Sequence, residues 1–129
     1  MPAADIPGAY AALRELMLRA APGMVVAKDE PGQLVLNAPW NNPLKPKEPM
    51  FFGSVRAGAA YAAFHLFPLY VLPELKGAVP EGLGKRMQGK TCFNFKAPDA
   101  ERFAELEALT REGARRFAEP FTPSYHSGG

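Results

Sequence analysis

Two amphipathic helical patterns enclose a central stretch of short apolar runs, and this order restricts the chain to few architectures. From Ile6 to Ala21 the apolar side chains recur at spacings of three and four while the charged ones fall elsewhere, which predicts an amphipathic helix. A longer pattern begins after Asp99, a residue type that caps helices, and ends at Pro120. Its apolar side consists of Phe103, Leu106, Leu109, Thr110, Gly113 and Phe117.

Five short runs between these helices have the composition and alternation of β-strands. They cover residues 24–28, 33–38, 50–56, 60–67 and 91–96. Turn-forming residues separate the first run from the second and the third from the fourth, so we expect two β-hairpins. We predict an α+β fold with an N-terminal helix, an antiparallel sheet of about five strands and a C-terminal helix, both helices lying on one face of the sheet.

Prolines and glycines mark the segments that should lie outside the sheet. Residues 39–49 carry four prolines and are predicted to form a stiff extended loop. Residues 68–88 are interrupted repeatedly by proline and glycine, which leaves room for helical turns at 71–76 and 83–88. We expect residues 120–129 to be a loose tail. The 129 residues contain no domain linker, so we predict a single domain, 1–129.

Composition argues against several classes of partner. The formal net charge is only +2, which gives no electrostatic reason to expect a nucleic acid or a membrane surface. No stretch approaches the roughly 20 apolar residues that span a bilayer, and the N-terminus lacks a signal-peptide pattern. The single cysteine, Cys92, excludes an intrachain disulfide framework and a Cys-rich zinc site. We therefore expect a cytoplasmic protein.

Residues 84–91 match the phosphate-binding pattern GxxxxGKT letter for letter. In nucleotide hydrolases a strand leads into that loop and a helix follows, so that backbone N–H groups face the phosphates. Here proline and glycine interrupt the residues upstream, and residues 91–96 alternate as a strand does. We interpret the match as fortuitous.

Strand alternation also predicts which side chains the helices leave uncovered, because successive side chains point to opposite faces. In the run 60–67, His65 and Tyr61 oppose an apolar set, and in the run 91–96, Asn94 and Lys96 do the same. Such a mixed polar and aromatic face can hold a small ligand or a protein partner. The candidate ligand-binding residues are Trp40, Arg56, Tyr61, His65, Arg86, Lys90, Asn94 and Lys96. A solvated face without a ligand is the alternative.

Arg86 and Lys90 join this set because residues 74–96 are locally basic. Glycines in the segment let the backbone approach an anion closely, so an anion-binding loop is one interpretation. The other is a solvated connection whose charges maintain solubility. The acidic residues of the last helical pattern alternate with arginines, which is typical of surface ion pairs rather than of paired catalytic carboxylates.

His65 and Cys92 could carry chemistry, although each also has a structural interpretation. No second histidine, cysteine or carboxylate surrounds His65 at metal-ligand spacing, so we predict no metal site. A packed histidine, a ligand contact and a general base stay open. Cys92 is either a small buried side chain or, because Lys90 and Lys96 are near it in the sequence, a reactive thiolate. We assign no catalytic residue, and a cofactor is unknown.

Three stretches carry a resemblance to a known family: residues 65–70, HLFPLY; residues 73–75, PEL; and residues 85–95, KRMQGKTCFNF. Over roughly residues 50–118 the chain resembles the YdhG-like family of small bacterial proteins. Members are similar in fold to frataxin, with a helix, an antiparallel sheet and a second helix. One member is regarded as an intracellular iron chaperone.

Three functions follow from these considerations. We expect a non-catalytic binding or adaptor protein for a small molecule or a protein partner. The resemblance implies, as an alternative, an iron chaperone that would use the carboxylates Asp5, Glu15, Asp29 and Glu30. A further alternative is a small enzyme acting on an anionic substrate, with His65 as acid or base and Lys90 or Arg86 holding the anion.

Overall fold

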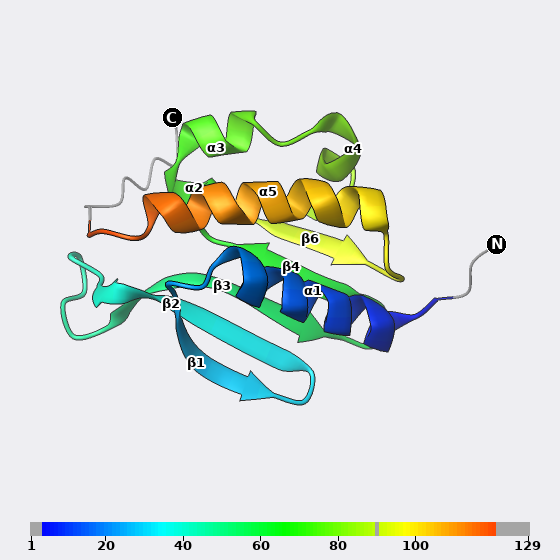
Figure 1. Ribbon diagram of the computed structural model, residues 1–129, viewed down its shortest axis with the longest axis horizontal. Helices are drawn as coiled ribbons and strands as arrows, with labels where there is room; N and C mark the ends of the chain where they lie inside the picture. The colour runs from blue at the N-terminus through cyan, green and yellow to red at the C-terminus, as the bar shows by residue number, and fades with distance from the viewer. Residues whose placement is uncertain (1–3, 90, 121–129) are drawn as a thin grey trace.

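The computed structural model describes residues 4–89 and 91–120 and has a helix near each end of this range, with a sheet between them. The elements are α1 (Ile6–Ala20), β1 (Val25–Glu30), β2 (Gln33–Asn41), β3 (Pro49–Ala57), β4 (Ala62–Leu66), α2 (Pro68–Val71), α3 (Pro73–Gly77), α4 (Glu81–Gly84), β5 (Met87–Gln88), β6 (Cys92–Phe95) and α5 (Ala100–Arg116). The strands form one open antiparallel sheet in the order β1-β2-β3-β4-β6-β5 (Figure 1). The α+β class is thus confirmed.

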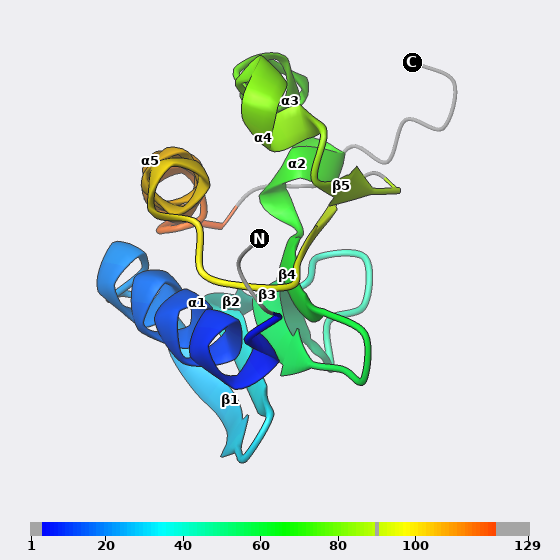
Figure 2. The same ribbon diagram turned by 90° about the vertical axis from the view of Figure 1, so that its right-hand side faces the viewer.

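Helices α1 and α5 lie side by side on one face of the sheet (Figure 2). Their N-termini are capped by side chains, because Asp5 Oδ1 accepts a hydrogen bond from the Gly8 N–H and Asp99 Oδ1 accepts one from the Arg102 N–H. The predicted N-cap at Asp99 is therefore confirmed. The shorter helices α3 and α4 lie beside α5, away from α1 (Figures 1 and 2).

The sheet has six strands rather than about five. The additional strand, β5, falls within residues 83–88, where the sequence predicted a helical turn. It pairs with β6 through Met87–Phe93 and Gln88–Cys92, and Gly89 reverses the chain with φ 80°. Two residues are too short a run to show the alternation by which strands are recognised in a sequence.

Strand β2 also extends further than predicted. The sequence placed Pro39 in a loop, whereas β2 continues to Asn41. Its ladder with β3 is irregular here, since Asn37 pairs with Phe51 and the next pair is Asn41 with Pro49. A proline is tolerated in a strand where no regular ladder needs its missing N–H. The remaining loop closes through a hydrogen bond from the Asn42 N–H to the Glu48 carbonyl.

The core lies between the sheet and the pair α1 and α5. Phe52 of β3 and Phe117, just beyond α5, are fully buried with ring centroids 5.7 Å apart, and Phe95 of β6 packs edge-on against Phe103 of α5 at 4.8 Å. Trp40 belongs to this side, since its indole N–H donates a 2.9 Å hydrogen bond to the Phe117 carbonyl. Burying each such large side chain contributes about 1.5–3 kcal/mol relative to exposing it.

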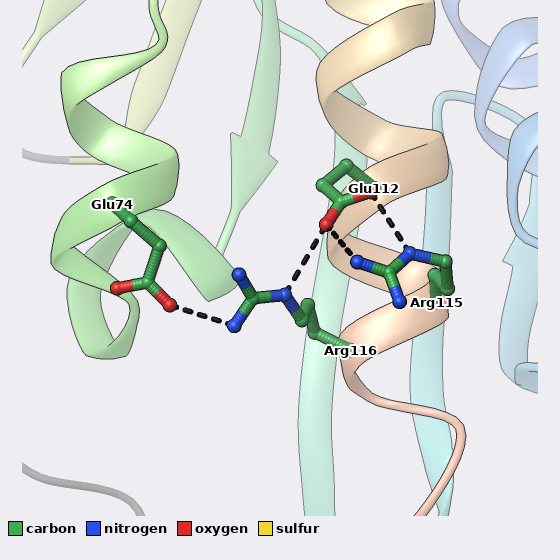
Figure 3. Close-up of polar contacts among 4 residues, drawn as sticks. All are labelled: Glu74, Glu112, Arg115 and Arg116. Atoms are coloured by element: carbon green, nitrogen blue, oxygen red, sulfur yellow. Dashed lines mark hydrogen bonds and ion pairs between the residues drawn. The ribbon is translucent and has the colours of Figure 1, made fainter.

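Ion pairs connect the outer side of α5 to α3. Glu112 accepts hydrogen bonds from Arg115 and Arg116, and Arg116 also donates to Glu74 of α3 at 2.6 Å (Figure 3). These bonds, with Arg115 first, lower the pKa of the Glu112 carboxyl to about 2. The carboxylates of α5 thus form surface ion pairs, as the sequence predicted.

The residues that match the phosphate-binding pattern do not form a loop before a helix. Gly84 ends α4, and the described residues after it form β5 and β6. The described residues of the match therefore lack the strand–loop–helix arrangement of nucleotide hydrolases. Within the described ranges no helix is long and apolar enough to cross a membrane. The expected tail lies outside the described residues except for Pro120.

Candidate functional site

The face of the sheet opposite α1 and α5 carries two cross-strand rows of partly buried or exposed side chains. One row runs from Gln33 through Arg56 and Ala63 to Asn94, because each of these residues pairs with the next across neighbouring strands. The core-facing neighbour Phe64 is 0% exposed, whereas Ala63 is only partly buried. The alternation predicted from the sequence is therefore present, and this side of the sheet is the uncovered face.

A second row follows the first along the strands. Ser54 pairs with His65, and His65 pairs with Cys92. The two rows are two residues apart on each strand, which corresponds to roughly 7 Å.

A hollow of about 430 Å³ opens at the β3–β4 end of the uncovered face. Its lining residues are Arg56, Gly58, Ala59, Ala60, Tyr61 and Ala63. The turn is closed by a 2.9 Å hydrogen bond from the Gly58 N–H to the Tyr61 carbonyl, and the Tyr61 side chain stays 40% exposed. Ala63, which lines the hollow, pairs with Arg56 on one side and with Asn94 on the other.

Arg56 differs from every other arginine of the chain. The others, Arg14, Arg19, Arg86, Arg102, Arg111, Arg115 and Arg116, each lie 3.7 Å or less from a carboxylate oxygen. No carboxylate among residues 4–89 and 91–120 forms an ion pair with Arg56, which is exposed. Its guanidinium therefore presents several N–H donors to the hollow without an acidic partner from the described chain.

The other predicted ligand-binding residues are distributed more widely. Lys96 is two residues beyond Asn94 and exposed. Arg86 lies at the β5 edge, where its carbonyl accepts from the Asn94 N–H and its guanidinium lies 3.7 Å from Asp99.

Trp40 lies on the helix side, bonded to Phe117, so the expectation that it borders the uncovered face is wrong. Side chains of β2 alternate, and Trp40 is two residues from the buried Ala38. Lys90 lies outside the described residues.

His65 and Cys92 form a contact that the sequence did not predict. The distance from His65 Nδ1 to Cys92 Sγ is 3.0 Å, and Thr91 Oγ1 lies 3.3 Å from each ring nitrogen. The ring of Phe51 covers the imidazole at a centroid distance of 5.2 Å. Burial lowers the pKa of His65 below its ordinary value, which favours the neutral imidazole.

Strand alternation placed His65 and Cys92 on the same face, but the sequence did not indicate which strands are neighbours in the sheet. Residues 65 and 92 meet because β4 pairs with β6, and a pairing between non-consecutive strands leaves no local pattern. Thr91 and Phe51 were missed for the same reason. The Phe51 ring beside the imidazole comes from β3, and the Thr91 hydroxyl comes from the residue that precedes β6.

The four carboxylates of the iron hypothesis all have other partners. Asp5 caps α1, and Glu30 lies 3.9 Å from Lys28. Glu15 and Asp29 both bind Arg14, whose hydrogen bond to Asp29 lowers the pKa of that carboxyl. Within the part of the chain that the structure describes, no three His, Cys, Asp or Glu residues are grouped so that they could hold a metal ion.

A larger hollow of about 660 Å³ lies on the helix side, between the end of α1 and the last turns of α5. Its lining is mainly small and apolar, and its charged residues are already paired. Arg115 binds Glu112, and Arg111 binds Glu107. This hollow offers few polar groups to orient a ligand.

A scan against protein-family models found no match, and searches of curated proteins and of solved structures found none either.

Proposed function

We propose that the protein is a non-catalytic binding protein that holds a small anionic molecule in the hollow beside Arg56. The observation that carries this proposal is the arginine itself: within the described chain it is the exception to a consistent pairing of arginine with carboxylate, and it lines a hollow. A planar guanidinium binds carboxylate and phosphate groups through two parallel hydrogen bonds.

The size of the hollow supports a small molecule rather than a protein. Its volume of about 430 Å³ is within the usual range for small-ligand sites, roughly 300–1,000 Å³. The wall formed by Tyr61 supplies aromatic area, while the glycine and alanines of the turn leave the backbone accessible. Asn94 and Lys96, beyond Ala63, would bind polar groups at the other end of a longer ligand.

Family membership and location are separate proposals. We retain the YdhG-like relationship and a frataxin-like arrangement because the helix, antiparallel sheet and helix occur in the order that the resemblance implies. A cytoplasmic location is supported by the single cysteine, which suits a reducing compartment.

The binding proposal is tested by NMR titration of ¹⁵N-labelled protein with inorganic phosphate and with citrate, at ionic strength held constant with chloride. We expect the largest shifts at the amides of Arg56, Tyr61 and Ala63. The substitution Arg56→Gln should weaken binding of the better probe about tenfold to a hundredfold, because a hydrogen bond to a charged group contributes roughly 1.5–3 kcal/mol.

Lys76→Gln is the matched control, since it removes one exposed positive charge from α3. It should leave the dissociation constant unchanged. That result would show that the weaker binding of Arg56→Gln does not come from the change in net charge. Equal binding by the wild-type protein and Arg56→Gln, or shifts scattered over the surface, would contradict the proposal.

A further inference from the structure

Cys92 has a base in contact with its sulfur. His65 Nδ1 lies 3.0 Å from Sγ, which is within hydrogen-bonding reach for a thiol. The two side chains come from neighbouring strands that pair directly at these residues, so the backbone ladder fixes their approach. A nucleophile and a base placed in this way are the arrangement by which proteins activate a thiol.

The surroundings of the imidazole favour its neutral form, in which one ring nitrogen keeps a lone pair that can receive a proton. Its burial favours the neutral ring, and in the tautomer that carries hydrogen on Nε2 the Nδ1 lone pair faces the thiol. Thr91 Oγ1 and the Phe51 ring lie against the imidazole and limit its rotation. Among the described residues no carboxylate forms an ion pair with His65, so cysteine is its acid partner.

We propose that Cys92 is a site of thiol–disulfide exchange with a low-molecular-weight disulfide, with His65 as the general base. As Sγ attacks one sulfur of the disulfide, its proton moves to His65 Nδ1. A new bond forms between Sγ and the attacked sulfur, and the original S–S bond breaks. The leaving thiolate takes the proton from the imidazole and departs as a thiol. The Cys92 sulfur is oxidised and the leaving sulfur is reduced, so no other oxidant is required.

Access to the sulfur is consistent with this reaction. Cys92 is partly exposed and lies on the uncovered face, on which neither α1 nor α5 packs. Buried structural cysteines are inert because a disulfide cannot reach their sulfur to be attacked, whereas reactive ones combine partial exposure with a neighbouring base or cation. The described chain places the base directly beside this sulfur.

The test uses the intact protein and oxidised glutathione as the probe. The chain has one cysteine, so intact-mass spectrometry followed over time gives the rate of a single addition without mapping. At pH 7 we expect the native protein to react about tenfold faster than the same chain unfolded in urea, because general-base assistance accelerates proton transfer by roughly two orders of magnitude or more where it is fully effective.

The substitution His65→Gln separates the base from a merely structural role. A glutamine amide oxygen accepts a hydrogen bond from the thiol but does not take its proton, so the rate should fall about tenfold toward the value of the unfolded chain. Cys92→Ser should show no adduct. Circular dichroism should be used to check that each variant is folded. If His65→Gln does not fold, the proposal is tested by the wild-type protein alone, through the ratio of its reaction rate in the native state to its rate in the unfolded state.

Two results overturn the proposal. One is a native rate equal to or below that of the unfolded chain, which would show that the fold protects the thiol instead of activating it. The other is an equal rate for the wild-type protein and a folded His65→Gln variant, which would show that the imidazole takes no part.

Discussion

Arg56 and His65 occupy comparable positions on adjacent cross-strand rows, yet their surroundings give them different properties. Arg56 is exposed beside the β3–β4 turn and keeps its charge in contact with solvent. His65 is partly buried between Phe51, Thr91 and Cys92, where a positive charge is disfavoured. One position therefore suits anion binding and the other suits the neutral form of a base.

His65 should make the protein less stable in mild acid. Its folded-state pKa lies below the ordinary value of 6.5, so the unfolded chain takes up a proton first. The free energy of unfolding then falls as pH decreases below about 6.5, until the folded-state pKa is also passed. The variant His65→Gln should show a smaller loss between pH 7 and pH 5 in urea unfolding followed by Trp40 fluorescence. An equal loss in both proteins would contradict this assignment.

At the scale of elements, α1 and β4 approach strand β3 closely at Gly53. A Cβ atom at this position would lie 2.7 Å from the His65 carbonyl oxygen of β4 and 2.8 Å from Met17 Cε of α1. The methionine end can move, but the carbonyl belongs to a paired strand. The glycine thus allows α1 and β4 to approach β3 this closely at Gly53. The position of His65 depends on that packing.

The substitution Gly53→Ala should destabilise the protein by about 1–3 kcal/mol, the usual cost of overpacking a core. Gly23→Ala is the matched control, since a Cβ there meets nothing within 4 Å, and it should leave stability nearly unchanged. Midpoints of urea unfolding measure both effects. Equal midpoints for the two variants would show that the contact at Gly53 relaxes without cost.

At the scale of the whole molecule, two helices cover one face of the sheet and leave the other face uncovered. Much of this could be predicted, because amphipathic periods and alternation are local properties of a sequence. These local patterns predict where α1 lies and that Asp99 caps a helix. They also predict that Arg56 and His65 lie on the uncovered face. The hollow does not, since it depends on the conformation of the turn at residues 58–61.

The remaining differences arise from non-local pairing. His65 and Cys92 are separated by 26 residues, and their contact requires β4 to pair with β6, which no hairpin pattern in the sequence indicates. The strand β5 is too short to show a period, and Pro39 is accommodated by an irregular ladder that only the partner strand reveals. Trp40 reached the helix side because β2 continued through that proline.

The most direct test of the account is native mass spectrometry of untagged protein isolated gently from cells, with a denatured aliquot analysed for released small molecules. We predict that the wild-type protein and Lys76→Gln carry a small organic anion, whereas Arg56→Gln is obtained without it, because the guanidinium is the principal anion contact. Bare protein in every preparation, or the same molecule retained by Arg56→Gln, would contradict the claim that the hollow beside Arg56 is the binding site.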